Sequence, residues 1–201
     1  SLDGQGEENR RFRRPAHSDV PDAYAHLMSL RPQLLKIPRV GITQTIPPAA
    51  AAKAAQNFSH LMGLGFWRFN LLPGYYLPWR EQQLKSLAHS FDGIAEQIEA
   101  RWKSDKRFYL RNLFTWAPTP FFNTGMVVDG DGTIHPSNVG LSGQLDGLRG
   151  QTQVGDLSHP PTREALKAKA NEVEALLIQS LEPRVWSSTQ AVDAELSRLC
   201  Q

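Results

Sequence analysis

The fold is decided by the stretch Val40-Gly41-Ile42-Thr43-Gln44-Thr45-Ile46-Pro47-Pro48, which leads into the alanine-rich run 49–61. Its first seven residues alternate small or apolar with polar side chains and are rich in β-branched types. That pattern predicts a strand that ends at the two prolines. Alanine is the strongest helix former, so a helix follows, and a second strand is predicted over 66–72. This order is typical of a parallel βα unit.

Further helices are predicted on both sides of this unit. Apolar residues at helical spacing predict a helix from Tyr24 to Leu35, after a loop that holds four arginines. A longer helix is predicted from about Arg80 to Lys103, because one apolar stripe recurs there at three- and four-residue steps. The stripe consists of Leu84, Leu87, Phe91, Ile94, Ile98 and Trp102. Residues 1–105 therefore predict an α/β domain with parallel strands.

The sequence changes character after residue 105. A strand is predicted over 109–114, and the Asp-Gly pairs between apolar runs in 126–135 predict a β-hairpin. Thr162 can cap a helix that Pro183 ends, and a short helix is expected over about 189–199. We therefore expect residues 106–201 to form a smaller second domain.

Composition excludes several classes of protein. The chain has 201 residues, 40% of them hydrophobic, and a formal net charge of +2. The one basic cluster, Arg10, Arg11, Arg13 and Arg14, is too narrow for a nucleic-acid binder. No apolar stretch reaches the roughly 20 residues of a membrane span, and no secretion signal opens the chain. Cys200 is the single cysteine, which excludes an internal disulfide, a zinc site built from several thiolates and a complete iron–sulfur cluster within this chain, so we expect a cytoplasmic protein.

Two short motifs have ordinary explanations. Asp129-Gly130-Asp131-Gly132 resembles the start of a calcium loop, but Ile134 and Gly140 stand where such a loop needs glycine and glutamate. A hairpin turn is therefore favoured. Gly140-Leu141-Ser142-Gly143 is one residue short of a nucleophile elbow and lacks its strand–turn–helix context. The six histidines are scattered without the spacing of metal ligands.

Polar residues gather instead at the predicted strand ends. Ser1 and Asp3 read like the exit from a strand, and the next two strands end near Thr45 and Asn70. In a parallel layout such residues share one rim, together with Arg13 from the first loop. Each has an alternative role in capping a turn or ending a strand, but their shared location favours a binding site. An abrupt start at a strand end also suggests the rear half of a larger catalytic unit.

At these residues the sequence resembles the second half of a radical S-adenosylmethionine (radical SAM) enzyme, of the branch that bears a SPASM or twitch extension. The likeness rests on Ser1-Leu2-Asp3-Gly4 with Arg13, on Thr43-Gln44-Thr45-Ile46, and on Phe69-Asn70-Leu71-Leu72-Pro73. In the second half it rests on 128–136 and 154–157. The resemblance covers nearly the whole chain. It implies the C-terminal half of a partial (β/α)6 TIM-like barrel over 1–105, and over 106–201 a SPASM/twitch-like extension with a small β-hairpin and helices.

The resemblance also implies an activity and a set of site residues. In that family a four-iron four-sulfur cluster and S-adenosylmethionine together yield a 5′-deoxyadenosyl radical that abstracts a substrate hydrogen. Ser1 and Arg13 would contact the ribose or the methionyl carboxylate of S-adenosylmethionine. The adenosine side would be lined by Gln44, Thr45, Asn70 and Leu72. Asp3 is the candidate catalytic base, with turn capping as the alternative. Aromatic residues that could meet a peptide substrate, or merely pack, are Tyr75, Tyr76, Trp79 and Trp116.

Two departures from the family pattern limit what this chain does. The cluster-binding Cys-x3-Cys-x2-Cys loop is absent, as is the first half of the barrel, so we expect a missing N-terminal half on the same chain or a separate subunit. The segment alone should be inactive. Asn123-Thr124-Gly125 and Ser137-Asn138 stand where the extension places cysteines, so auxiliary clusters are not expected. The alternative is a non-catalytic binding or scaffold module derived from the same fold.

Overall fold

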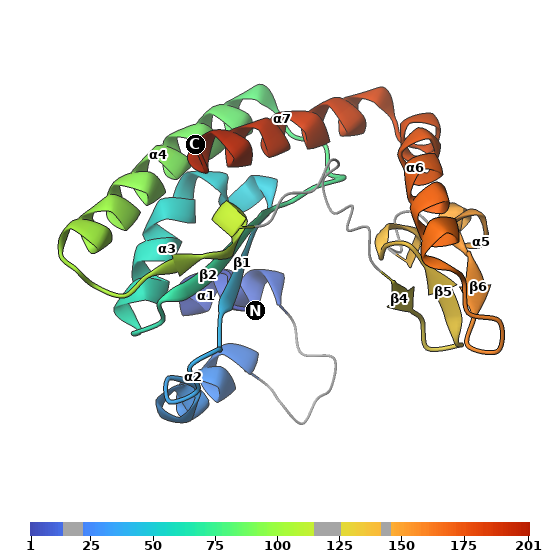
Figure 1. Cartoon of the computed structure of the whole chain (residues 1–201). Coiled ribbons are helices and arrows are strands. Elements are labelled where there is room, and N and C mark those ends of the chain that lie inside the picture. Colours follow the sequence, from blue (N-terminus) through green and yellow to red (C-terminus); the bar gives the residue numbers. More distant parts are fainter. Residues whose placement is uncertain (14–21, 115–125, 142–145) are drawn as a thin grey trace. The chain divides into compact units, whose positions relative to one another are not determined.

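A computed structural model describes residues 1–13, 22–114, 126–141 and 146–201 (Figure 1). The chain divides into two compact units. The first contains Ser1–Thr115 together with Ser188–Gln201, and the second contains Trp116–Ser187. The predicted division at residue 105 placed all of 106–201 in the second domain, whereas the third strand and the last 14 residues here belong with the first unit.

The first unit is built on a parallel three-stranded sheet, which confirms the predicted α/β class. Its strands are β1 (Ile42–Ile46), β2 (Arg68–Pro73) and β3 (Tyr109–Leu110), in the order β1-β2-β3. β3 is shorter than predicted, because Arg111–Phe114 form a 3-10 turn, η2. Within the described residues these strands form an open sheet and not a closed barrel, so the TIM-like arrangement stays a prediction.

Helices cover one face of this sheet. The alanine-rich run begins as a 3-10 helix, η1 (Pro48–Lys53), and continues as α3 (Ala54–Gly63), while the apolar stripe forms α4 (Glu81–Lys103). η1 and α3 both pack against α4. The core beneath them contains alternate strand residues and the apolar stripe: Ile42, Ile46, Phe69, Leu71, Phe58, Leu61, Leu87, Phe91 and Ile94. The two-residue period of the strands thus turns one set of side chains to the helices and the other set away from them.

Two further helices precede the sheet. α2 (Ala23–Leu34) matches the predicted helix, and the Asp22 side chain caps it by accepting from the Ala25 N–H. α1 (Gly6–Phe12) includes Arg10 and Arg11, so the prediction of a loop there was wrong. A seven-residue helix is too short to display an apolar stripe. Its signal was electrostatic, since Glu7 and Glu8 occupy the first turn and the two arginines the last.

The C-terminal helix α7 (Pro183–Leu199) begins six residues earlier than predicted. Proline is tolerated in the first turn of a helix, so Pro183 opens α7 as well as following α6. At its other end Arg198 pairs with Asp92 and donates to the Ala88 carbonyl, both on α4. The C-terminal part of α7 therefore lies along α4, as Figure 1 shows.

The second unit contains the predicted β-hairpin. β4 (Val127–Val128) and β5 (Thr133–His135) pair antiparallel around a turn in which Gly132 has φ +85°, and β6 (Gly155–Asp156) adds to the other edge of β5. The short helix α5 (Arg149–Thr152) precedes β6, and α6 (Arg163–Ser180) follows it. Thr162 caps α6 by accepting from the Ala165 N–H, as expected. No helix in the described ranges has both the length and the apolar character required to cross a bilayer.

Candidate functional site

The candidate site lies at the carboxyl end of β1, where Asp3, Arg13 and Thr45 are bonded to one another. The Arg13 Nε and Nη2 atoms donate to the two carboxylate oxygens of Asp3 at 2.8 and 3.0 Å. Nη2 also donates to the Thr45 hydroxyl at 2.9 Å, and the Thr45 N–H donates to Asp3 at 3.0 Å. The structure thus brings together three of the predicted site residues, the outermost of which, Asp3 and Thr45, are 42 positions apart in sequence.

Two buried asparagines hold this arrangement in place. Asn9 accepts from the Asp3 N–H through its side chain and from the Arg13 N–H through its carbonyl, so one residue of α1 fixes both partners. Asn57 of α3 accepts from the Gln5 N–H. Gly4 is required here, because a Cβ at that position would lie 2.1 Å from Asn57 Cγ. The Ser-Leu-Asp-Gly start is therefore a turn fitted between α1 and α3.

Asp3 is fully engaged by these contacts. Its side chain is 5% exposed and accepts from the Arg13 guanidinium and the Thr45 backbone. The carboxylate therefore acts as the anchor that orients Arg13, and its proposed role as a base stays a prediction. The Arg13 side chain is 35% exposed, and within the described residues its hydrogen bonds leave from Nε and Nη2. Nη1 is the part of the guanidinium left to meet a ligand.

Two more of the predicted residues, Asn70 and Leu72, share with Thr45 the sheet face that turns away from the helices. Thr45 pairs in register with Leu72, and Thr43 with Asn70, and all four are half-buried. Gln44 lies on the opposite face. It is fully buried and donates to the Ala54 carbonyl at 3.1 Å, so it faces the helices and not Thr45 or Asn70. Successive side chains of a strand point to opposite faces of the sheet, so Gln44 and Thr45 lie on different faces although they are neighbours in sequence.

Ser1 lies beside this cluster. Its side chain is exposed, and it lies two residues before Asp3 in the chain. A shared ligand for Ser1 and Arg13 stays a prediction.

The predicted aromatic contacts lie in the loop that follows β2. Tyr75 is 9% exposed, and its hydroxyl donates to Asp193 of α7 at 3.0 Å. Burial, followed by the charge of Asp193, raises the pKa of Tyr75. Tyr76 is half-buried and adopts a left-handed conformation with φ +59°. Trp79 is buried as well, whereas Trp116 lies outside the described residues. Tyr75 and Trp79 therefore contribute to packing.

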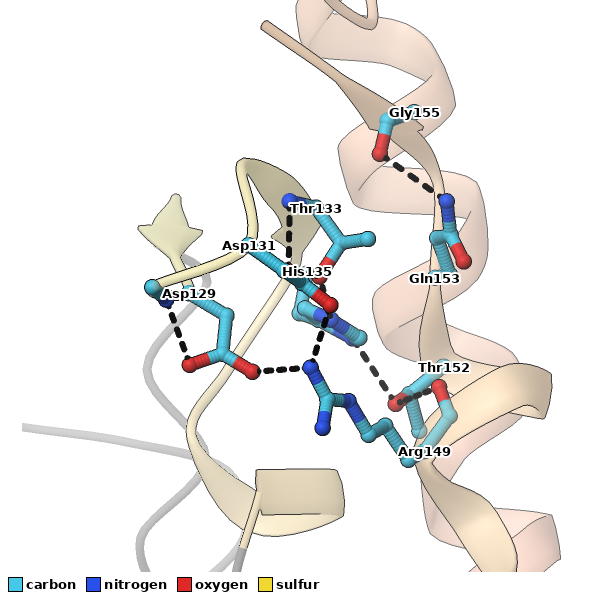
Figure 2. Close-up of polar contacts among 9 residues, drawn as sticks. Asp129, Asp131, Thr133, His135, Arg149, Thr152, Gln153 and Gly155 are labelled. Atoms are coloured by element: carbon cyan, nitrogen blue, oxygen red, sulfur yellow. Dashed lines mark hydrogen bonds and ion pairs between the residues drawn. The ribbon is translucent and has the colours of Figure 1, made fainter.

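The second unit has a polar cluster of its own around the hairpin (Figure 2). Arg149 of α5 donates from Nη2 to both Asp129 and Asp131, at 2.5 and 2.6 Å. Asp131 also accepts from the hydroxyl and the N–H of Thr133, and these bonds, together with Arg149, lower its pKa. Both aspartates are thereby occupied within the turn, which agrees with a hairpin and not a calcium loop.

His135 is the buried centre of this cluster. Its Nε2 lies 3.1 Å from the Thr133 hydroxyl and its Nδ1 lies 3.1 Å from the Thr152 hydroxyl (Figure 2). Burial lowers the pKa of His135, which favours the neutral form of the ring. Ser137, which stands in a predicted cysteine position, is buried and accepts from the Val139 N–H. Asn123, Thr124, Gly125 and Ser142 lie outside the described residues.

Metal ligation finds no support in these clusters. Across residues 1–13, 22–114, 126–141 and 146–201, no three histidine, cysteine or acidic side chains come together as a metal site. Cys200 is half-buried, and burial raises the pKa of its thiol.

Sequence reasoning missed Asn9, Asn57, Asp193 and Arg149. The two asparagines follow no motif, and the partners of Asp193 and Arg149 are 118 and 18 to 20 residues away. Only Arg149 had a signal in the sequence. Asp129 and Asp131 lie close together in the hairpin turn, and two neighbouring carboxylates favour a cation beside them. A scan against protein-family models finds no match to this chain, and a search of curated proteins finds none either.

Proposed function

We propose that this chain is the C-terminal portion of a radical SAM enzyme and supplies part of its binding surface for S-adenosylmethionine. The iron–sulfur cluster and the N-terminal half of the barrel would come from other residues, on the same chain or on a separate subunit. The observation that carries the proposal is the Arg13 guanidinium, which Asp3 and Thr45 fix at the carboxyl end of a parallel strand. Ligand sites of α/β proteins gather at that end.

The chemistry of Arg13 suits the carboxylate of S-adenosylmethionine. A planar guanidinium with free N–H groups in a fixed direction forms charge-assisted hydrogen bonds with a carboxylate. Because Asp3 already balances the charge of Arg13, the attraction for a second anion comes from the oriented Nη1 donors more than from net charge. This arrangement repels a positively charged ligand less than an unpaired arginine would, which suits the sulfonium of S-adenosylmethionine.

The sheet face that turns away from the helices is consistent with the interior of a larger barrel. Parallel sheets are normally covered on both faces. Here the helices cover the face of Ile42 and Phe69, while Thr43, Asn70 and Leu72 on the other face are half-buried. Leu72 would contact the apolar part of the adenosine, and Asn70 would offer its amide to the base or ribose. Gln44 is left out of this set, because its side chain is bonded on the helix side.

The residues of this chain do not fit the iron–sulfur cluster. A cluster of four irons needs several thiolates close together, and Cys200 is the single cysteine of the sequence. S-adenosylmethionine bound beside a cluster held by other residues would supply the radical chemistry of such an enzyme. The role of this chain is to bind and orient that molecule and to exclude water from it. The single cysteine also fits a reducing compartment, so the proposal places the protein in the cytoplasm.

A peptide is the proposed substrate class, on the strength of the resemblance and of the half-buried Tyr76 near the sheet end. A second candidate function is a binding or scaffold module without catalysis. It is favoured by the second unit, where Arg149 bridges the two aspartates of the hairpin turn and Ser137 accepts from the Val139 N–H, so these contacts form without thiolates.

The deciding experiment uses the longest open reading frame that contains this chain, reconstituted anaerobically with iron and sulfide. The proposal expects three closely spaced cysteines upstream, a cluster absorbance and cleavage of S-adenosylmethionine to 5′-deoxyadenosine. Arg13→Ala should weaken binding of S-adenosylmethionine at least tenfold, since it removes a charge-assisted contact. Arg10→Ala is the matched control, because Arg10 lies three residues before Arg13, is exposed and pairs with Asp22 instead of Asp3. Binding without cleavage in a cluster-free protein would favour the scaffold module, and equal affinity in both variants would remove Arg13 from the site.

A further inference from the structure

The loop that follows β2, residues 74–79, is fixed from one side by the C-terminal helix. Three side chains on one face of α7 bond to it. Thr189 accepts from the Tyr76 N–H at 2.9 Å, Ser188 accepts from the Trp79 N–H at 3.0 Å, and Asp193 accepts from the Tyr75 hydroxyl at 3.0 Å. Ser188 and Thr189 are 5% and 0% exposed, so these bonds are shielded from water.

The loop is also closed on itself. The Trp79 indole donates to the Gly74 carbonyl at 2.8 Å, and Trp79 is 3% exposed. Tyr76 has φ +59°, a conformation that costs a bulky residue free energy and that persists where neighbouring contacts hold it. The Tyr76 N–H donates to the Thr189 hydroxyl, so this hydrogen bond stabilises the residue with the unfavourable conformation. The loop therefore has one well-defined arrangement, and α7 supplies contacts that select it.

The position of the loop relates it to the candidate site. The Gly74 N–H donates to the Ile46 carbonyl at 2.9 Å, one residue after Thr45, whose hydroxyl contacts Arg13. Leu72, which pairs with Thr45, lies two residues before Gly74. The loop thus leaves the sheet at the same carboxyl end that carries Arg13.

We propose that Ser188, Thr189 and Asp193 are positioning residues of the S-adenosylmethionine site, which they shape by holding the loop 74–79 at the carboxyl end of the sheet. This inference rests on the proposed function, and it adds that the C-terminal helix belongs to the site although no residue of it needs to touch the ligand. The ligand class is the sulfonium nucleotide itself, since the loop borders Leu72 and Thr45.

The test compares Thr189→Val with Thr189→Ser in the complete, cluster-reconstituted protein. Valine keeps the shape of threonine and removes the acceptor of the Tyr76 N–H, whereas serine keeps the hydroxyl. Gln190→Ala is the control, because Gln190 is the exposed neighbour on the same helix. Two quantities are measured for each variant: hydrogen exchange of the amides in 74–79, and the affinity for S-adenosylmethionine by equilibrium dialysis. Ser188→Ala serves as a second variant if Thr189→Val does not fold.

The inference expects Thr189→Val to accelerate exchange at Tyr76 and to weaken S-adenosylmethionine binding about fivefold, the effect of one hydrogen bond. Thr189→Ser should restore both. Faster exchange with unchanged affinity would make the bonds purely structural and overturn the inference while the proposed function stands. If the wild-type protein binds no S-adenosylmethionine while Tyr76 exchange still depends on Thr189, the proposed function fails and the inference fails with it.

Discussion

The side chain of Asn112 bonds both backbone groups of Leu71, accepting from its N–H at 2.8 Å and donating to its carbonyl at 2.9 Å. An amide side chain here takes the place of a neighbouring strand. β3 pairs with β2 at Arg68 and Phe69 and then turns away, and Asn112 completes the pairing two residues further along. This contact lets η2 begin where a strand was predicted without leaving a buried peptide group unpaired.

Asn112→Ala should therefore destabilise the first unit by about 1–3 kcal/mol, because Leu71 is fully buried and loses both partners. Urea denaturation followed by tryptophan fluorescence measures this loss. Asn112→Asp should recover little, since its carboxylate would face the Leu71 carbonyl without a proton to donate. A loss below about 0.5 kcal/mol for the alanine variant would mean that water replaces the amide.

Gly4→Ala should disrupt the candidate site by displacing the segment that carries Asp3. The added Cβ would lie 2.1 Å from Asn57 Cγ, and Asn57 is buried, so we expect a loss of stability of about 2 kcal/mol or more. Displacement of Asp3 should also release Arg13, which NMR of the arginine Nε–H can follow. Gly63→Ala is the control, because nothing lies within 4 Å of its Cβ position and alanine favours the helix.

The second unit should lose stability as the pH falls below about 6.5. The folded pKa of His135 is lowered by burial, so the unfolded chain takes up a proton first, and protonation favours unfolding. The stability of the neutral His135 state is fully present above the pKa that His135 has in the unfolded chain. It is lost as the pH falls from there through the lower pKa of the folded state. Thermal unfolding at pH 7.5 and pH 5.5 measures this loss of stability. Both pH values lie above the range in which Asp131 and Asp156 titrate, because the pKa of each is lowered. His135→Gln should flatten this dependence by more than His159→Gln does, because the His159 imidazole is exposed and lies 3.4 Å from Asp156.

Arg149→Ala should weaken the hairpin by about 1 kcal/mol, because exposed ion pairs contribute little individually but this arginine separates two carboxylates. Salt should reduce the difference between variant and wild type. Arg163→Ala, also on an exposed part of the unit, is the comparison. Equal effects of the two changes would contradict a specific role for the Arg149 bridge.

The sequence predicted the elements with strong periodicity and missed those fixed by single contacts. β1, β2 and α4 follow from alternation and from the apolar stripe, and the hairpin follows from its Asp-Gly turn. α1 was missed because a short polar helix has no stripe, and β3 was overextended because Asn112 substitutes for backbone pairing. The first of these differences depends on where charges lie, and the second depends on a single residue. A periodic pattern of apolar residues detects neither.

The candidate site was predicted in part for a similar reason. Asp3, Arg13 and Thr45 were expected at one strand end and do meet, since parallel topology brings strand ends together. Gln44 was placed in the same group because the prediction considered position along the strand and not the face. The bonds from Tyr75 to Asp193 and from Tyr76 to Thr189 join residues 118 and 113 positions apart, a separation that no local pattern encodes.

Residues 188–201 belong with the first unit although the entire second unit precedes them in the chain. During synthesis on the ribosome, the loop after β2 emerges more than 100 residues before Ser188 and Thr189 do. The loop can acquire these partners only after residues 188 to 193 have been translated, so a premature stop codon ahead of Ser188 in α7 would leave Tyr75, Tyr76 and Trp79 without these bonds.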